Sequence, residues 1–334
     1  MSIRIQDVAR TANVSVSTVS RVLNGKYGVA PETYQRVRKI IDDLGYSSSL
    51  AARSMRGRTN VIGVLTFFLS LPFNTEVIRG IEQVAQTHGY DLLVYTSNRN
   101  NHKGDPAWEH KAVAQLNGTI VDGMIVITPM TVNMPSNHPL VTIEPSAEGS
   151  YPSVLSTNRA ATCEAIHYLI QLGHRRIAFL GGDPVLLSAR QRRQGYEDAL
   201  RQAGLPLMDE LYAEGNYLRQ GALRAAAKLL SLPERPTAIM AANDQSAFAV
   251  FEVANHLGIR VPQDLSLIGF DNVPESAYTS PPLTTVDQGL VAMGSRASEL
   301  LIQMLGGHTV ENRVFQLPAR LVVRESCRAL VETG

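Results

Sequence analysis

The sequence predicts a small all-α headpiece followed by a larger α/β body made of two doubly wound parallel-sheet lobes. Helical spacing of apolar residues near the N-terminus predicts the headpiece. An alternation of short β-rich runs with amphipathic helices from residue 60 onward predicts the body. Charge divides the chain at the same place, because residues 1–58 hold ten Lys and Arg against four Asp and Glu, whereas the whole chain has a net charge of +1. The basic headpiece is therefore the part expected to meet an anionic partner.

The first two helices are predicted between Ile5 and Leu23, separated by a short turn. Apolar or small residues recur with the i, i+3, i+4, i+7 spacing of one helical face, at Ile5, Val8, Ala9 and Ala12 and then at Val19, Val22 and Leu23. Between the two runs, Asn13 tolerates a left-handed turn, Val14 can fill the angle between the helices, and Ser15 is a good N-cap. This pattern predicts a helix-turn-helix.

The free face of the second helix has the composition expected of a helix that reads DNA. Arginine can fork onto guanine, hydroxyl groups can donate or accept, and a valine methyl can meet thymine. The alternative is an ordinary surface helix in a small bundle, but the N-terminal position, the short turn and the basic segment favour DNA. The residues predicted to contact DNA are Ser15, Val16, Ser17, Thr18, Arg21 and Asn24.

A third helix is predicted from Pro31 to Leu44, with proline in its first turn and Gly45 at its end. The run DVARTANVSVSTVSRVLNG, the Val29-Ala30-Pro31 helix start and the LGY that ends at Tyr46 then complete a pattern. Together they resemble the headpiece of the lactose/galactose repressor (LacI/GalR) family of bacterial transcription regulators.

Three positions depart from the pattern of that family. Arg4 and Ala30 stand where it usually has a hydroxyl N-cap, which is expected to cost about 1 kcal/mol of helix stability each. Ser48-Ser49 stands where the family usually has Pro-Asn, and Ser49 can still cap the helix that follows.

The segment LAARSMRGR, residues 50–58, matches the hinge helix of the family. A helix of about two turns is unstable alone in water, because nucleation costs more than so few hydrogen bonds return. The resemblance implies that two hinge helices pair in the minor groove, where Ala52 contacts DNA and Met55, at a position usually held by leucine, wedges between base pairs. An ordinary interdomain linker is the alternative. The expected organisation is a headpiece at 1–47, a hinge and linker at 48–59, and an effector-binding and dimerisation body at 60–334.

Strand-like and helical runs alternate through the body. The strand-like runs are 61–67, 91–96, 123–127, 140–143, 176–180, 237–241 and 265–270. The helical runs are 76–88, 108–117, 160–172, 189–203, 219–230 and 246–257. A single sheet made from all these strands would be larger than is usual for a chain of this length, so two doubly wound sheets are predicted. The N-lobe is expected at about 60–157 and 289–317, and the C-lobe at about 158–287 and 320–334.

The body resembles the periplasmic-binding-protein-like effector domain of the same family. The matching segments are LGHRRIAFLGG at 172–182, SARQRRQGY at 188–196, ANDQ at 242–245, IGFDN at 268–272 and PPLTTVDQ at 281–288. Each fragment is weak alone, but their order and spacing after the headpiece make the match strong. The resemblance implies a cleft between two lobes that binds a small molecule, usually a sugar or a related metabolite.

Polar residues at strand ends locate this cleft independently, because ligands of open parallel sheets bind beyond the carboxyl ends of the strands. Asn243 and Asp271 follow strand ends, and an amide with a carboxylate can serve vicinal hydroxyls. Arg190 follows a strand-end loop, although it could instead begin a solvated helix, and Asp271 could simply cap a turn. By resemblance, Arg190, Asn243 and Asp271 match the polar effector contacts of the family, and Phe73, Glu144, Tyr217 and Gln288 match more loosely.

The expected function is a DNA-binding transcriptional regulator, a repressor, that recognises a palindromic operator in double-stranded DNA. A small-molecule effector, a sugar or sugar derivative, is expected to switch that binding. One headpiece covers only a half-site, so a homodimer is expected. Helix 246–257 is apolar nearly all round, which predicts packing against its own sheet on one side and a second subunit on the other.

Other functions are weighed against this expectation. A nucleoside- or purine-responsive regulator remains an alternative, since Ile127 stands where some sugar-binding relatives carry a polar residue. A periplasmic-type sugar-binding protein would share the body but needs an export signal, and Met1–Arg10 is not one. No stretch is long and apolar enough for a membrane helix, so a cytoplasmic protein is expected.

Catalysis, cofactors and metals are not expected either. The sequence has no GxSxG, no GxxxxGK[ST] and no GxGxxG after a strand, which argues against an enzyme. The eight histidines show no metal-ligand spacing. Cys163 and Cys327 lie far apart in apolar contexts, so they are expected to be reduced core thiols.

Overall fold

The structure is a computed structural model that describes residues 3–23, 27–46, 58–96, 106–131, 133–147, 149–311 and 313–330. It divides into two compact units, Met1–Thr59 and Asn60–Gly334. Three residues that the sequence assigns to DNA contacts, Asn24, Ala52 and Met55, lie outside the described residues, as does most of the predicted hinge.

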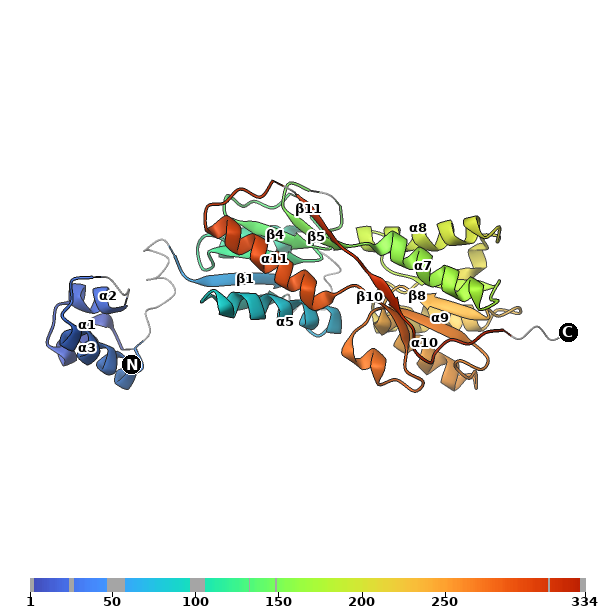
Figure 1. The fold of residues 1–334 in the computed structure, drawn as a ribbon, viewed down its shortest axis with the longest axis horizontal. Coiled ribbons are helices and arrows are strands. Elements are labelled where there is room, and N and C mark those ends of the chain that lie inside the picture. Colours follow the sequence, from blue (N-terminus) through green and yellow to red (C-terminus); the bar gives the residue numbers. More distant parts are fainter. Residues whose placement is uncertain are drawn as a thin grey trace. The chain divides into compact units, whose positions relative to one another are not determined.

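The first unit holds the three predicted helices, α1 (Ile5–Ala12), α2 (Val16–Leu23) and α3 (Pro31–Leu44) (Figure 1). Its core is small and consists of one apolar stripe from each helix, in which Val8, Val19 and Val37 are fully buried. Asn13 adopts the left-handed conformation between α1 and α2, with φ 47° and ψ 51°. The predicted turn between the two helices is therefore confirmed.

The ends of these helices follow from their capping residues. Ser15 caps α2, because its Oγ accepts a hydrogen bond from the backbone N–H of Thr18 at 3.1 Å. Arg4 cannot accept in this way, but its backbone N–H donates to the Asp7 carboxylate at 2.9 Å, which ties down the start of α1. Ala30 offers no side-chain cap to α3, and Gly45 ends that helix in the left-handed region with φ 61°.

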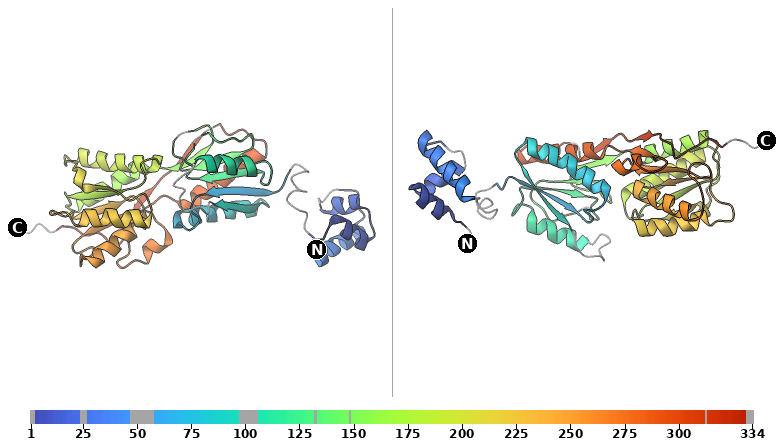
Figure 2. Two further views of the ribbon diagram at one scale, coloured as in Figure 1. Left: turned by 180° about the vertical axis from the view of Figure 1, so that it is seen from behind. Right: turned by 90° about the horizontal axis from the view of Figure 1, so that it is seen from below.

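The N-lobe of the second unit is a six-stranded parallel sheet in the order β11-β5-β4-β3-β1-β2. Helices α5 (Pro72–Thr87) and α11 (Leu290–Leu305) pack on one face of the sheet, and α6 (Pro106–Leu116) packs on the other (Figure 2). The strands are β1 Val61–Thr66, β2 Asp91–Thr96, β3 Gly123–Ile127, β4 Leu140–Ile143, β5 Ser153–Ser156 and β11 Val314–Leu317.

The C-lobe repeats this arrangement with the order β12-β10-β9-β8-β6-β7, and only the pairing of β12 with β10 is antiparallel. Helices α7 (Asn158–Gln171) and α8 (Leu187–Gln202) cover one face, and α9 (Arg219–Leu230) and α10 (Asp244–His256) cover the other. The strands are β6 Ile177–Gly181, β7 Tyr212–Glu214, β8 Ala238–Ala241, β9 Ser266–Asp271, β10 Thr284–Asp287 and β12 Arg320–Val322.

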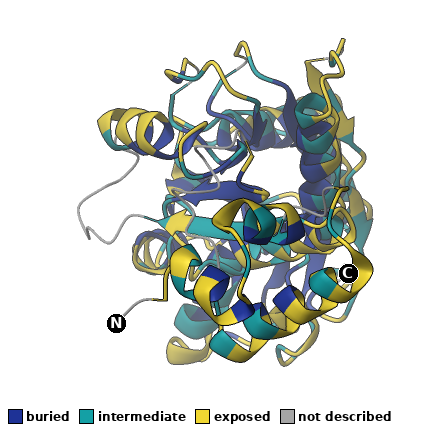
Figure 3. Ribbon diagram, turned by 90° about the vertical axis from the view of Figure 1, so that its left-hand side faces the viewer, coloured by how far each residue is buried: buried dark blue, intermediate teal, exposed yellow. Residues whose placement is uncertain are grey.

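The central strands of both sheets are buried on both faces, as the dark strands in Figure 3 show, whereas the edge strands β2, β7, β11 and β12 are partly exposed. Successive side chains point to opposite faces, so Phe179 packs under α7 and α8 while Leu180 packs under α9 and α10. This two-sided burial explains why the strands read as continuous apolar runs. The predicted fold class, an all-α headpiece with two doubly wound parallel-sheet lobes, is confirmed.

The chain passes between the lobes at three places, from β5 to α7, from β10 to α11 and from β11 to β12. The three connections lie close to the cleft, because every one of them leaves the carboxyl end of a strand. Among the described residues, no helix is long and apolar enough to cross a membrane.

Six of the strands and α-helices are absent from the sequence-based prediction, namely β5, β7, β10, β11, β12 and α11. The five strands have only three or four residues each, too few to show a period, and long-range pairing with neighbouring strands determines them. The buried face of α11 contains the small residues Gly294, Ala297 and Ser298, so it shows no simple apolar stripe. In addition, α5 begins at Pro72 rather than at the predicted Glu76, because proline suits the first position of a helix.

Two glycines let α5 and α11 cross closely. A Cβ atom at Gly80 would overlap the carbonyl oxygen of Val291, and one at Gly294 would overlap the carbonyl oxygen of Val77. Since each obstacle is backbone, neither helix can accommodate a larger residue without moving. The contact fixes α11 to the N-lobe immediately after the second crossing between the lobes.

Replacing Gly80 with alanine should lower the free energy of unfolding by about 1–3 kcal/mol, because the added methyl forces α5 away from α11. Gln83→Ala on the exposed side of the same helix is the matched control and should change it by less than about 0.5 kcal/mol. Urea denaturation followed by circular dichroism measures both, and equal midpoints for the two variants would contradict the close crossing.

Candidate functional site

The start of α2 presents a polar, accessible surface. Ser15, Ser17 and Arg21 are exposed, Val16 is 42% exposed, and Thr18 is half-buried. The Ser15 hydroxyl lies 2.7 Å from the Ser17 hydroxyl and 2.8 Å from the Thr18 hydroxyl, so the three side chains form one chain of hydrogen bonds. This surface offers the hydroxyl, methyl and guanidinium groups that base edges require, and DNA contact by these residues stays a prediction.

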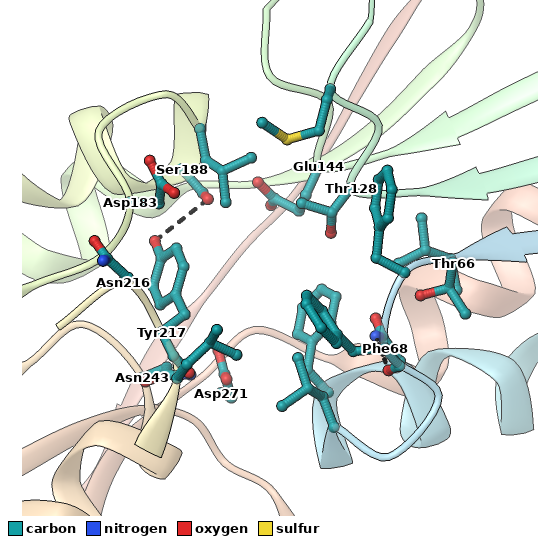
Figure 4. A pocket seen from close by; sticks show the side chains of 18 of the residues that line it. Thr66, Phe68, Thr128, Glu144, Asp183, Ser188, Asn216, Tyr217, Asn243 and Asp271 are labelled. Atoms are coloured by element: carbon teal, nitrogen blue, oxygen red, sulfur yellow. Dashed lines mark hydrogen bonds between the residues drawn. The ribbon is translucent and has the colours of Figure 1, made fainter. Parts of the chain in front are cut away.

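A cavity of about 150 Å³ lies between the two lobes of the second unit, at the carboxyl ends of the strands. Figure 4 shows residues of the C-lobe, among them Tyr217 and Asp271, facing residues of the N-lobe, among them Glu144 and Phe68, across the open space. The lining residues are Thr66, Phe67, Phe68, Leu71, Phe73, Asn74, Ile127, Thr128, Met130, Glu144, Asp183, Leu186, Ser188, Arg192, Asn216, Tyr217, Leu218, Asn243 and Asp271.

Five of the seven residues assigned to the effector from the sequence line this cavity, namely Phe73, Glu144, Tyr217, Asn243 and Asp271. Gln288 does not line the cavity, but it lies directly behind it, where its Nε2 donates to the Asp271 carboxylate at 2.6 Å. The structure therefore brings six of the assigned residues together. Their contact with an effector stays a proposal.

Arg190 was also assigned to the effector from the sequence, but the structure does not place it among the residues that line the cavity. Its guanidinium donates to the carbonyl oxygens of Pro184 and Val185 in the C-lobe and of Ser146 in the N-lobe, at 3.0, 2.6 and 2.8 Å. The arginine that lines the cavity is Arg192. Side chains two residues apart on a helix point in different directions, so Arg190 and Arg192 lie on different faces of α8.

Helical periodicity in the sequence could have identified the correct arginine. Ser188, Arg192 and Tyr196 are spaced four residues apart, so they lie on one face of α8, and all three are buried. Arg190 and Arg193 fall outside that face and are more accessible. The buried serine and tyrosine on either side were therefore the usable signal.

Arg192 lies at the centre of a group of polar side chains that also includes Asn158, Asp271 and Gln288, and this group forms the floor of the cavity. Its Nε donates to the Asn158 side chain at 2.8 Å, and its Nη1 donates to the Ala242 carbonyl at 2.5 Å and to Asp271 at 3.5 Å. Its Nη2 donates to the side chain of Gln288 at 3.4 Å. The guanidinium also lies over the Phe270 ring, 3.6 Å from the ring centre, and this cation–π contact stabilises its charge.

Two buried carboxylates flank this arginine. Asp271 ends β9, and burial raises its pKa to about 7, although Arg192 and the hydrogen bond from Gln288 both favour the charged form. Glu144 follows β4 and accepts hydrogen bonds from the Ser156 backbone and the Asn158 amide, but burial still raises its pKa. The floor is therefore a low-dielectric site in which ionised carboxylates are costly.

A third carboxylate lies behind the floor. Asp244 is fully buried in the first turn of α10, where it accepts hydrogen bonds from the Thr285 hydroxyl and the Val273 backbone. Burial and the nearby Asp271 raise its pKa well above the ordinary value. Its neighbour Asn243 caps α10 through a hydrogen bond from the Ser246 backbone and also lines the cavity.

Several lining residues adopt the left-handed backbone conformation that non-glycine residues rarely populate. Their φ angles are 51° at Thr128, 46° at Glu144, 55° at Asn216, 61° at Tyr217 and 115° at Asp271. Such conformations cost about 1–3 kcal/mol each and persist where the surrounding structure fixes them, often at functional sites. Here they turn the side chains toward the cavity from the ends of strands and loops.

Tyr217 forms part of the C-lobe wall. Its hydroxyl lies 3.4 Å from the Ser188 hydroxyl, as the dashed line in Figure 4 shows. Its ring lies against Gly182, where a Cβ atom would overlap the ring, so a larger residue there would displace Tyr217. Together with Phe67, Phe68 and Phe73, this tyrosine gives the cavity aromatic walls above a polar floor.

The raised pKa of Asp271 predicts a specific dependence of stability on pH. From about pH 4 to pH 7 the folded protein keeps a proton that the unfolded chain has released, so this group stabilises the fold fully at low pH and loses that contribution as pH rises to about 7. Asp271→Asn cannot ionise and should remove this contribution. Urea denaturation across this range measures the free energy of unfolding of both proteins. The difference in this free energy between the native protein and the variant should change by at most about 1.4 kcal/mol per pH unit. Parallel pH profiles would contradict the assignment.

The chain is similar to known regulatory proteins over nearly its whole length. Residues 4–49 match the family of bacterial regulatory proteins called lacI, and residues 166–327 match a periplasmic binding protein-like domain. Catabolite control protein A of Priestia megaterium is 35% identical over 342 residues, which cover 98% of this chain and 100% of that protein.

Solved structures agree with this relationship. The lac repressor dimer bound to operator and the anti-inducer ONPF superposes with a TM-score of 0.84 and 27% identity, covering 98% of this chain and 100% of that one. A complex of the transcriptional regulator CelR with cellobiose gives a TM-score of 0.72 and 27% identity, covering 97% and 99%. The resemblance read from the sequence is confirmed, and the protein belongs to the lacI family of bacterial regulatory proteins as a DNA-binding transcriptional regulator with an effector-binding domain.

Proposed function

We propose that this regulator is a cytoplasmic, homodimeric repressor that binds a palindromic operator. A sugar or sugar derivative bound between the two lobes is proposed to switch this binding. The observation that carries the proposal is the cavity itself, which joins aromatic walls to a floor of converging polar groups. A pyranose ring presents apolar faces and a hydroxyl rim, so it needs both kinds of surface. The similar regulator CelR, solved with cellobiose, supports this ligand class.

The polar groups are suited to vicinal hydroxyls. Asn243 can donate and accept, Asp271 and Glu144 accept, and the Ser188 hydroxyl can do either. Tyr217 and Phe73 supply flat surfaces on the C-lobe and N-lobe sides. A hexose between the lobes would thus bond to both lobes at once and hold them together.

A nucleoside is the second candidate, and one observation favours it. Phe67, Phe68, Phe73 and Tyr217 all line the cavity, and Ile127 adds a further apolar surface. A planar base stacks on aromatic rings more extensively than a puckered sugar ring does. The carboxylates and Asn243 would then serve the ribose hydroxyls or the edge of the base.

The switch is proposed to run through the segments that join the lobes. Asn158 begins α7 directly after the first crossing, and Gln288 follows β10 at the second, and both contact Arg192 in the floor. A ligand on the floor therefore changes the same contacts that set the angle between the lobes. Moving an operator from mostly bound to mostly free needs an effector preference of roughly 5 kcal/mol between the two states.

The dimer is proposed to use the outer side of α10, with one correction to the sequence-based prediction. Phe248 packs against the cores of both lobes, so part of the apolar surface of α10 is used within the chain. Phe251 and Val253 remain half-buried, and Leu257 just beyond the helix is 51% exposed.

The proposed reading helix gives a direct test. Arg21→Ala should weaken binding to the specific operator about tenfold to a hundredfold, because a bidentate guanidinium contact to a base is lost, while binding to random DNA changes little. Arg10→Ala, which removes an exposed guanidinium from α1, is the control. Electrophoretic mobility shifts with an operator obtained by genomic selection would measure both. If both variants lost the same amount of affinity for the specific operator, this result would argue against α2 as the helix that reads the base sequence.

The division into two units gives a second test. Residues 60–334 form a compact unit of their own, so this fragment should bind the effector but no operator. A thermal-shift screen of the fragment against sugars, polyols and nucleosides should find a ligand that raises its melting temperature, since the ligand binds only the native state. The same ligand should then alter operator binding by the full chain, and a ligand without that effect would contradict the switch.

A further inference from the structure

Arg190 does not line the cavity, yet it connects the two lobes that enclose the cavity. It stands in the first turn of α8 and is half-buried. Its Nη2 donates a hydrogen bond to the carbonyl oxygen of Ser146 in the N-lobe, at 2.8 Å. The hydrogen bonds from Asn158 to Glu144 also join the lobes, but Asn158 lies at a connection between them. The bond from Arg190 involves no such residue, so it forms only when the two lobes approach each other.

The C-lobe holds the guanidinium of Arg190 in place. Its Nη1 donates to the carbonyl oxygens of Pro184 and Val185, at 3.0 and 2.6 Å. Asp183 and Leu186, which flank these two residues, line the cavity. Because two bonds within the C-lobe already fix the planar guanidinium, the bond to the N-lobe costs little further side-chain entropy.

The N-lobe holds the acceptor in place in the same way. Ser146 is buried, its backbone N–H donates to the Pro129 carbonyl at 3.0 Å, and its hydroxyl donates to the Met130 carbonyl at 3.1 Å. The fully buried carboxylate of Glu109 in α6 accepts from the backbone N–H groups of Met130 and Thr131, at 2.8 and 2.9 Å. Since Met130 lines the cavity, the acceptor belongs to a fixed part of the cavity wall.

The fixed positions of donor and acceptor make this hydrogen bond specific for one separation of the lobes. A guanidinium donor is charged, so its bond to a carbonyl is stronger than a bond between neutral groups. If the lobes separate, the bonds to Pro184 and Val185 can persist, whereas the bond to Ser146 must break. The free energy of this one bond therefore favours the arrangement in which the lobes are close.

We propose that Arg190 is a positioning residue of the cleft, which holds the cavity wall at 183–186 of the C-lobe against the wall at 129–131 and 144–146 of the N-lobe before any effector binds. Arg190 touches no effector in this role and acts through the separation of the lobes. The inference goes beyond the proposed function, and only its consequence for operator binding rests on that function.

Hydrogen–deuterium exchange of the full-length protein without any ligand tests the position of the lobes. The backbone N–H groups of Met130, Thr131 and Ser146 are all hydrogen-bonded within the N-lobe. In Arg190→Ala they should exchange about tenfold faster, because this wall loses its bond to the C-lobe and becomes accessible to water. Mass spectrometry of peptides that cover these residues measures the rates.

Two further variants make the measurement specific. Arg193→Ala is the matched control, because it removes the same charge from the same helix while the contacts of Arg193, with Glu197 and Tyr212, lie within the C-lobe. It should leave exchange in the N-lobe unchanged. Arg190→Gln keeps a polar side chain that is too short to reach both lobes, and it should accelerate exchange as Arg190→Ala does. Circular dichroism shows which variants fold, and either folded Arg190 variant is sufficient for the test.

The location of the faster exchange decides the outcome. Faster exchange that is confined to residues 183–187 of the C-lobe would show that Arg190 holds only its own loop, and this result would overturn the proposal. Unchanged exchange throughout a folded Arg190 variant would overturn it as well.

Operator binding separates this inference from the proposed function. Without ligand, both Arg190 variants should change the affinity for an operator obtained by genomic selection by about fivefold or more, whereas Arg193→Ala should not. If exchange in the N-lobe is accelerated while operator affinity stays constant, the role of Arg190 is supported and the proposed switch through the lobes is overturned.

Discussion

The effector domain depends on one buried guanidinium. Arg192 is 3% exposed, and it binds side chains or carbonyls from four separate segments of the chain, namely Asn158, Ala242, Asp271 and Gln288. A charge at this depth is tolerable only because every neighbour is an acceptor or an aromatic face. In return, it fixes where three strands of the C-lobe and the first helix after the crossing meet.

This constraint links ligand recognition to the geometry of the two lobes. Asn158 and Gln288 lie at connections between the lobes, and Asn158 also donates to Glu144 of the N-lobe. The residues at the connections therefore contact Arg192 and Glu144, two side chains that line the cavity. In the N-lobe, the close crossing at Gly80 and Gly294 holds α11 against α5 directly after the second connection.

Much of the architecture could be predicted because its signals are local. The stripe of apolar residues in α1 and α2, the left-handed Asn13 and the serine cap are set by neighbours a few residues apart. The alternation of buried strands and helices is likewise periodic. The short strands β5, β7, β10, β11 and β12 were missed because pairing across the sheet, not their own short sequences, determines them. The sequence analysis named Arg190 and not Arg192, which lines the cavity, because it read the residue type without the direction of the side chain on the helix.

The sequence by itself determined the helix-turn-helix, the two-lobed α/β body and the family, because periodicity, capping and charge division are recorded in residues close together along the chain. It also placed Asn243 and Asp271 at strand ends, where a parallel sheet brings ligand-binding residues together. Only the tertiary structure decided which arginine enters the cavity, that Gln288 supports Asp271 from behind, and that carboxylates outnumber cations there. These features depend on contacts between residues 17 to 96 positions apart, whose relative placement no local pattern encodes.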